Sequence, residues 1–234
     1  TISLLTPTRN RFEKLQKMWI SARQKADYPE NLELVLYIDN DDKDTIEKLP
    51  QLYGYSRPYV VKARIGRRIT HSDMYNKLQH LINGDIYLIG ADDITFESHH
   101  WDSRIISEFA KYPDQICLVS CNDLYNKDIG THPFISRKST EILGYITPPY
   151  FSSDFADLWL DQLYRPNNRV VRLNDVVVKH WHYLGVGEQY KDDTIRQKEA
   201  RLHKDRPDLL FLSGEMKQQR WTDAQKLANH IQEF

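Results

Sequence analysis

Two adjacent carboxylates, Asp92 and Asp93, follow a short apolar run at residues 86–91. The run is rich in β-branched and aromatic residues, which predicts a buried strand with both acids at its carboxyl end. Charged groups beside a buried strand are costly unless a partner neutralises them. Carboxylate oxygens suit Mg²⁺ or Mn²⁺, and these ions usually accompany a phosphate group. An acidic surface turn is the alternative explanation for this pair considered alone.

The elements that would position these acids alternate along the chain. Strands are predicted at 2–6, 32–38, 59–62, 85–89, 116–120 and 170–179. Helices are predicted at 11–25, 45–52, 71–83, 101–112, 153–164, 193–203 and 222–231. This alternation is typical of an α/β fold with a mostly parallel central sheet flanked by helices. Since ligands of such sheets bind outside the carboxyl ends of the strands, the polar residues at 6–9, 39–42 and 92–93 should meet at one edge.

The composition is that of a globular protein of 234 residues, with 40% hydrophobic and 28% charged residues. A formal net charge of −1 gives no electrostatic basis for non-specific binding to DNA or membranes. No stretch has the apolar length of a transmembrane helix, and no signal sequence is recognisable, so a soluble, cytoplasmic protein is expected. Cys117 and Cys121 are too far apart on a predicted strand for a disulfide and are expected to be reduced thiols.

The ordered set of motifs resembles the GT-A glycosyltransferases of the family-2 kind. The set comprises Thr-Pro-Thr-Arg-Asn-Arg at 6–11, Asp39 after the second strand, Gly-Asp-strand-Asp-Asp at 84–93, Asp154 and Asp157 on a helix, and His-Trp-His at 180–182. The resemblance implies a single Rossmann-like GT-A domain at 1–184, with a nucleotide-sugar-binding half at 1–122 and an acceptor and catalytic half at 123–184. Residues 185–234 are expected to form a helical C-terminal extension packed on that domain.

The same resemblance implies where a nucleotide-diphosphate sugar binds. It places Thr6, Pro7 and Arg9 beside the nucleoside and Asp39 at the edge of the base, and it assigns further polar contacts to Asn76 and Asp92. Guanidinium groups bind phosphate oxygens in a bidentate manner, so the Arg-Ile-Gly-Arg-Arg stretch with Arg64 and Arg68 is a candidate for the diphosphate or ribose. A solvated basic loop is the alternative for these arginines, and a turn is the alternative for Asp39.

The metal motif of the family is Asp-x-Asp, and Gly90 occupies its first position here. The resemblance leaves Asp92 and Asp93 as metal ligands and requires another one, which His180 or His182 can supply to Mn²⁺ or Mg²⁺. Only one of the two histidines is expected to face the metal, and His182 is preferred because the family's ligand usually ends the segment. Packing at a domain edge is the alternative for both.

Asp154 and Asp157 are the candidate general bases. They are three residues apart on a predicted helix and would share a face near its N-terminus, where the helix dipole favours the ionised form. Asp157 is ranked first because Asp-Leu-Trp-Leu at 157–160 matches the family's segment after the base. Asp154 could instead be the helix cap.

The expected function is a metal-dependent glycosyltransferase that moves a sugar from a UDP- or GDP-linked donor to an acceptor hydroxyl, with inversion implied by the resemblance. The acceptor is left open among a glycan, a lipid-linked sugar, a protein and a modified nucleic acid. One alternative is a nucleotide-sugar-binding module of the same fold with weak or no catalysis. A nucleotidyltransferase is less favoured, because it would carry a Gly-rich phosphate loop and a lysine where this chain has Pro-Thr-Arg-Asn.

Overall fold

Eight strands form the central sheet of the computed structural model, which describes residues 1–53, 60–152 and 154–232. In chain order they are β1 (Ile2–Thr8), β2 (Leu32–Asp39), β3 (Val60–Gly66), β4 (Ile86–Ile89), β5 (Ile94–Phe96), β6 (Leu118–Asn122), β7 (Phe134–Ser136) and β8 (Val170–His180). Across the sheet the order is β3-β2-β1-β4-β7-β6-β8-β5. The pairs β1–β2, β1–β4, β2–β3 and β6–β8 are parallel, whereas β7 and β5 run antiparallel to their neighbours. The predicted α/β fold with a largely parallel sheet is confirmed.

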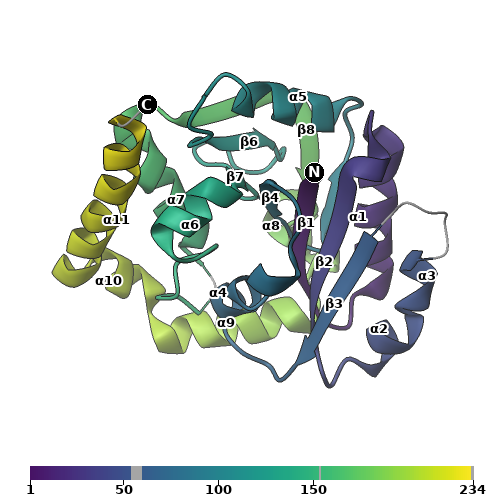
Figure 1. Ribbon diagram of the computed structural model, residues 1–234. Coiled ribbons are helices and arrows are strands. Elements are labelled where there is room, and N and C mark those ends of the chain that lie inside the picture. Colours follow the sequence, from purple (N-terminus) through teal and green to yellow (C-terminus); the bar gives the residue numbers. More distant parts are fainter. Residues whose placement is uncertain (54–59, 153, 233–234) are drawn as a thin grey trace.

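Helices lie on both faces of this sheet (Figure 1). They are α1 (Phe12–Lys25), α2 (Lys43–Lys48), α3 (Pro50–Tyr53), α4 (His71–Asn76), α5 (Trp101–Phe109), α6 (Arg137–Leu143), α7 (Ala156–Tyr164), α8 (Tyr183–Val186), α9 (Asp193–Asp205), α10 (Pro207–Leu212) and α11 (Gly214–Gln232), with short 3-10 turns η1 (Pro29–Asn31), η2 (Gln79–Leu81), η3 (Arg165–Asn167) and η4 (Glu188–Tyr190). Side chains alternate between the faces of a strand, so neighbours such as Leu4 and Leu5 enter different cores. One core contains Trp19 of α1 and Trp101 of α5, and the other contains Trp159 of α7.

Several element boundaries differ from the sequence-based predictions. β1 extends two residues further than expected, to Thr8, and the strand predicted at 116–120 begins at Leu118. The single helix predicted at 71–83 is divided into α4 and η2, and the one predicted at 45–52 into α2 and α3. β5 and β7 were not predicted, because three residues are too few to show an alternating pattern. Tyr59 and Ser153, the first residues of two predicted elements, lie outside the described residues.

The C-terminal extension is helical, and it packs on the second core. Phe211 of α10 and Leu227 of α11 are buried in the cluster that contains Trp159. The boundary predicted at residue 184 stays a prediction. Within the described parts of the chain, no helix combines the length and the apolarity needed to cross a membrane.

The two cysteines are buried free thiols, as expected; Cys121 lies within β6 and Cys117 directly precedes it. Burial raises the pKa of Cys117 and that of Cys121 to about 12, so both stay protonated at neutral pH.

Candidate functional site

The carboxyl ends of β1, β2 and β4 meet at one edge of the sheet because these strands are parallel neighbours. The Thr8 hydroxyl at the end of β1 donates to Asp92 Oδ2 at 2.9 Å. Arg9, which follows β1, places its Nε 3.5 Å from Asp39 Oδ2 at the end of β2. The three polar clusters predicted to meet therefore lie together.

Arg11 is the cation that holds the two adjacent acids. Its Nη1 lies 3.1 Å from Asp92 Oδ1 and 3.6 Å from Asp93 Oδ2. On its other side the guanidinium donates two hydrogen bonds to Asp192, at 2.8 and 2.6 Å. Burial raises the pKa of Asp92 above that of an ordinary aspartate, although Arg11 opposes the shift.

The histidines reach this edge through the pairing of β5 with β8. Ile94, directly after the two acids, is paired with His180, and the backbone N–H of Trp181 donates to the carbonyl of Asp93 at 2.9 Å. This register places His180 Nε2 3.6 Å from Asp93 Oδ1. His180 and His182 both line the same cavity, and the expectation that only one of them faces the metal stays a prediction. His180 ends β8, whereas His182 lies beyond the strand as the N-cap residue of α8.

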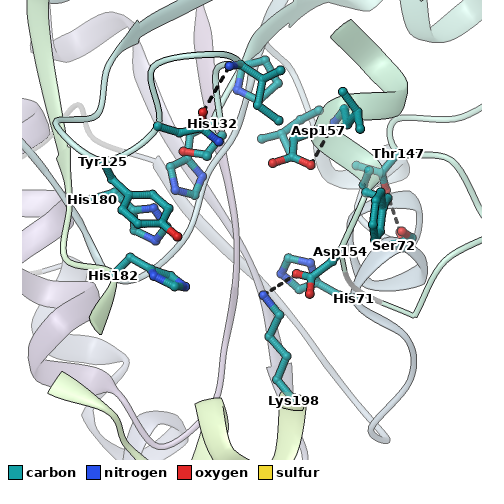
Figure 2. Close-up of a pocket in the computed structure, with 18 of the residues that line it drawn as sticks. His71, Ser72, Tyr125, His132, Thr147, Asp154, Asp157, His180, His182 and Lys198 are labelled. Carbon is teal, nitrogen blue, oxygen red and sulfur yellow. Dashed lines mark hydrogen bonds and ion pairs between the residues drawn. The ribbon is translucent and has the colours of Figure 1, made fainter. Parts of the chain in front are cut away.

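A cavity of about 540 Å³ opens in front of these side chains. Figure 2 shows His180, His182 and Tyr125 along one wall, with Asp154 and Asp157 across from them. This volume suits a small ligand or part of a larger one.

The two candidate bases differ in their surroundings. α7 begins at Ala156, after Phe155 in a left-handed conformation (φ 73°), so Asp154 lies before the helix and does not cap it. The Asp154 carboxylate lies 2.5 Å from the Lys198 ammonium group. Among the described residues Asp157 has no ion pair, and burial raises its pKa although its carboxylate accepts a hydrogen bond from the backbone of Leu158. Burial outweighs the helix-terminal environment that was expected to favour the charged form.

Two residues predicted to contact the nucleotide have buried oxygen atoms that can still accept a hydrogen bond. Thr6 Oγ1 and Asp39 Oδ1 are buried and have no hydrogen-bond partner within the described residues. The Nε of Arg68 lies 3.9 Å from Asp39 Oδ2, so Arg9 and Arg68 both flank this carboxylate. A buried acceptor between two cations is suited to a ligand that donates a hydrogen bond.

The other predicted nucleotide contacts include Pro7, Arg64 and Asn76, and their roles stay predictions. Pro7 is buried within β1, opposite Tyr37 of β2, and Arg64 is exposed on β3. The Asn76 amide donates to the carbonyl of Thr147 and accepts from two backbone N–H groups, at Ile146 and Thr147. Asn76 therefore fixes a loop and is not directed into the cavity.

Helix α9 lies across this edge of the sheet (Figure 1). Its first half and its N-cap contact residues of the site in four places: Asp192 with Arg11, Thr194 with the carbonyl of Arg9, Gln197 with Arg68, and Lys198 with Asp154. The sequence indicated only a solvated helix here, because contacts between residues so far apart leave no local pattern.

Arg11 and His132 are two further residues at this edge to which the sequence assigned no role. Arg11 was assigned to the start of the first helix, and His132 lies in a loop without periodicity. Arg11 ends the Thr-Pro-Thr-Arg-Asn-Arg motif, but the resemblance gave it no role, and the only signal for His132 was the composition of its Thr-His-Pro segment.

The side chains near Asp93 carry donor atoms of the types that bind a divalent cation, but these atoms do not converge on one point. Three imidazole nitrogens around it are buried and lack a hydrogen-bond partner among the described residues: His132 Nε2, His180 Nδ1 and His182 Nδ1. Nitrogen and carboxylate donors together suit Mn²⁺. As placed, no group of three or more His, Cys, Asp or Glu side chains in the described ranges converges to hold an ion. The rings would have to turn about their side-chain torsions to do so.

The fold is that of GT-A-type nucleotide-sugar transferases. No protein-family model and no curated protein sequence matches the chain. Among solved structures, the mannosyltransferase PcManGT from Pyrobaculum calidifontis, in complex with GDP-Man and Mn²⁺, aligns with a TM-score of 0.64 and 18% identity over 80% of this chain. GalNAc-T7 with UDP, GalNAc and Mn²⁺ aligns with a TM-score of 0.62 and 12% identity over 77% of this chain. S. aureus TarS aligns with a TM-score of 0.60 and 12% identity over 76% of it.

At these identities the likeness shows the fold alone. The aligned region covers 57% of PcManGT, 43% of GalNAc-T7 and 36% of TarS, so the chain corresponds to only part of each. The fold implied by the sequence motifs is confirmed.

Proposed function

We propose that this chain transfers a sugar from a UDP- or GDP-linked donor to an acceptor hydroxyl, with inversion at the anomeric carbon. The observation that carries the proposal is the cavity at the carboxyl edge of a GT-A fold. It has Asp157, a half-buried carboxylate with a raised pKa, on one wall and the histidines beside Asp93 on the other.

The proposed reaction is a single displacement. The acceptor oxygen attacks the anomeric carbon and forms the new glycosidic bond, while the bond from that carbon to the phosphate oxygen breaks and the nucleoside diphosphate leaves with the electron pair. Asp157 takes the proton of the acceptor hydroxyl. A carboxylate with a raised pKa is a stronger base than an exposed aspartate, which favours this role. Asp154 is less suited to it, because Lys198 holds its negative charge.

The donor nucleotide is proposed to lie along the ends of β1 and β2. Asp39 Oδ1 can accept a hydrogen bond from a base N–H, which both uracil and guanine present. Arg9 and Arg68 flank that carboxylate, and their guanidinium groups can contact ribose or phosphate oxygens. Thr6 offers a further buried hydroxyl.

A divalent cation, Mn²⁺ or Mg²⁺, is part of this proposal, since two of the structural neighbours hold Mn²⁺. Asp93 and the histidines of the 180–182 segment would hold it, with Asp92 oriented beside them by Arg11. When bound, it supplies positive charge for the departing diphosphate.

Isothermal titration of UDP and GDP, with and without Mn²⁺, tests this proposal. One of the two nucleotides should bind, and more tightly with Mn²⁺. Substituting Asp39→Asn should weaken binding about tenfold or more, because the base loses a charged hydrogen-bond acceptor. The matched control is Asp175→Asn, an exposed partner of Arg104, which should bind like the wild type. Failure of the wild type to bind either nucleotide would overturn the proposal.

A binding module without turnover is the second candidate, and Gly90 favours it because the family has an acid at that position. Release of nucleoside diphosphate from a donor sugar separates the two candidates. Turnover by the wild type that is lost in Asp157→Asn excludes the binding module.

A further inference from the structure

His132 lines the cavity and has no part in the proposed reaction. It belongs to the loop that leads into β7, and the carbonyl of the next residue, Pro133, accepts a hydrogen bond from the backbone N–H of Ile89 at 3.0 Å. Ile89 ends β4, four residues before Asp93. The backbone thus holds His132 next to the strand that carries the two acids, and Figure 2 shows its ring on the same wall as His180.

One ring nitrogen of His132 is free to bind a metal ion. Its Nε2 is buried and has no hydrogen-bond partner among the described residues. A buried imidazole nitrogen without a partner can offer its lone pair to a metal ion.

The spacing of the three rings also fits a shared ion. For a metal–nitrogen bond of about 2.1 Å, two imidazoles bound at right angles or slightly wider have ring centroids roughly 4.6–5.3 Å apart. The centroids of His132 and His180 are 4.6 Å apart, and those of His180 and His182 are 5.2 Å apart. These two separations lie within the range that neighbouring ligands of one ion require.

The site also lacks one oxygen ligand that the Asp-x-Asp motif would supply. A Cβ atom at Gly90 would lie 3.3 Å from the carbonyl oxygen of Leu5 and from the Leu88 side chain, so an acid there would be crowded. The carboxylate of Asp92 has little capacity left to bind an ion, because its two oxygens accept hydrogen bonds from Thr8 and Arg11. Asp93 is left as the carboxylate that faces the histidines.

We propose that His132 is a direct ligand of the divalent cation, together with Asp93, His180 and His182, and replaces the missing first acid of the motif. The inference rests on the proposed function, whose cation it locates. A set of three nitrogens and one carboxylate favours Mn²⁺ over Mg²⁺, because Mg²⁺ prefers oxygen ligands. The site is therefore expected to select Mn²⁺.

Electron paramagnetic resonance of Mn²⁺ added to the full chain, without nucleotide, tests this inference directly. The wild type should bind one Mn²⁺, and a tenfold excess of Mg²⁺ should not displace it. His132→Ala and His132→Gln should each bind Mn²⁺ about tenfold or more weakly. His80→Ala is the matched control, because His80 is exposed on η2, and it should bind like the wild type.

Pulsed measurements on the bound Mn²⁺ add a signature that a structural role would not change. Coupling to imidazole nitrogen should be strong in the wild type and reduced in His132→Gln, which keeps most of the side-chain volume. Equal Mn²⁺ affinity and equal nitrogen coupling in the wild type and both His132 variants would overturn the inference. The proposed function fails by a different result, namely the absence of UDP and GDP binding to the wild type.

Discussion

At the scale of residues, the site is organised around one buried guanidinium. Arg11 is about one-tenth exposed and contacts Asp92, Asp93 and Asp192, so three carboxylates share a single arginine. Lys14 adds a second cation to Asp192 at 2.8 Å. The carboxylates remain charged in this buried position because these cations compensate them.

Substituting Arg11→Met should destabilise the fold by about 3–5 kcal/mol, because it leaves Asp92 and Asp93 buried without their cation. The loss should be smaller at pH 5 than at pH 7. A carboxyl group whose pKa is raised in the folded state contributes stability below that pKa, and the contribution disappears as the pH rises through it. Urea unfolding at both pH values measures the effect.

The control for Arg11→Met is Arg104→Met, which removes an exposed ion pair with Asp175. Its cost should be below about 1 kcal/mol at either pH. Equal losses for the two variants would contradict the role given to Arg11.

Residue identities at strand ends were predictable, and contacts that bridge distant segments were not. Asp92 and Asp93 were singled out because they follow an apolar run, which a sequence shows directly, and the histidines of the 180–182 segment were singled out through the family resemblance. His132 and Asp192 were missed because loop conformation and long-range pairing decide where they lie. Asn76 matched a family position, yet its amide is used by the backbone of residues 146 and 147.

At the scale of elements, helix α9 depends on polar contacts with the site. Ile195 is the one buried residue of α9, so the helix has little apolar attachment. Segments with few buried apolar contacts open with low free energy. The contacts through Asp192, Gln197 and Lys198 should therefore decide how firmly α9 covers the cavity.

Substituting Asp192→Asn should loosen α9 while keeping its cap, because asparagine also caps helices. Amide exchange in α9 should become about tenfold faster through the loss of the charged hydrogen bonds to Arg11 and Lys14. Hydrogen–deuterium exchange measures this, with Asp208→Asn, a change in an exposed ion pair of α10, as the control. Unchanged exchange in α9 of Asp192→Asn would show that other contacts hold the helix.

Acid should have the same effect as that substitution. Burial raises the pKa of Asp192, but hydrogen bonds from Arg11 and Lys14 outweigh this effect and hold the pKa well below its usual range. A carboxyl group whose pKa is lowered in the folded state contributes stability at any pH above its pKa in the unfolded state. That stability is lost as the pH falls through its pKa in the folded state. α9 should thus stay attached at pH 5 and loosen only in stronger acid.

Long apolar elements were also the ones that the sequence predicted well. β2 and α1 are found close to their predicted ranges, because each has enough residues to show its periodicity. β5 has three residues, yet its pairing with β8 brings His180 to Asp93. The element that assembles the site is thus among those with the weakest sequence signal.

At the scale of the whole molecule, the chain folds back so that its second half completes the site of its first half. β8 pairs with β6 and β5, which returns residues 170–180 to the edge where β1, β2 and β4 end. The alternation of strands and helices predicted a parallel sheet that binds its ligand at the carboxyl ends of the strands. It could not predict strand order, because hydrophobic pattern does not specify which strands become neighbours.

The most direct test of the central claim is release of UDP or GDP from a panel of nucleotide sugars, compared between the wild type and Asp157→Asn across pH. The wild type should release nucleoside diphosphate from at least one donor, and its rate should fall with acid at a pH above the usual pKa of an aspartate, because burial raises the pKa of Asp157. Asp157→Asn should be about a hundredfold slower or worse through loss of the general base. No release by the wild type, or an equal rate in both proteins, would contradict glycosyl transfer with Asp157 as its base.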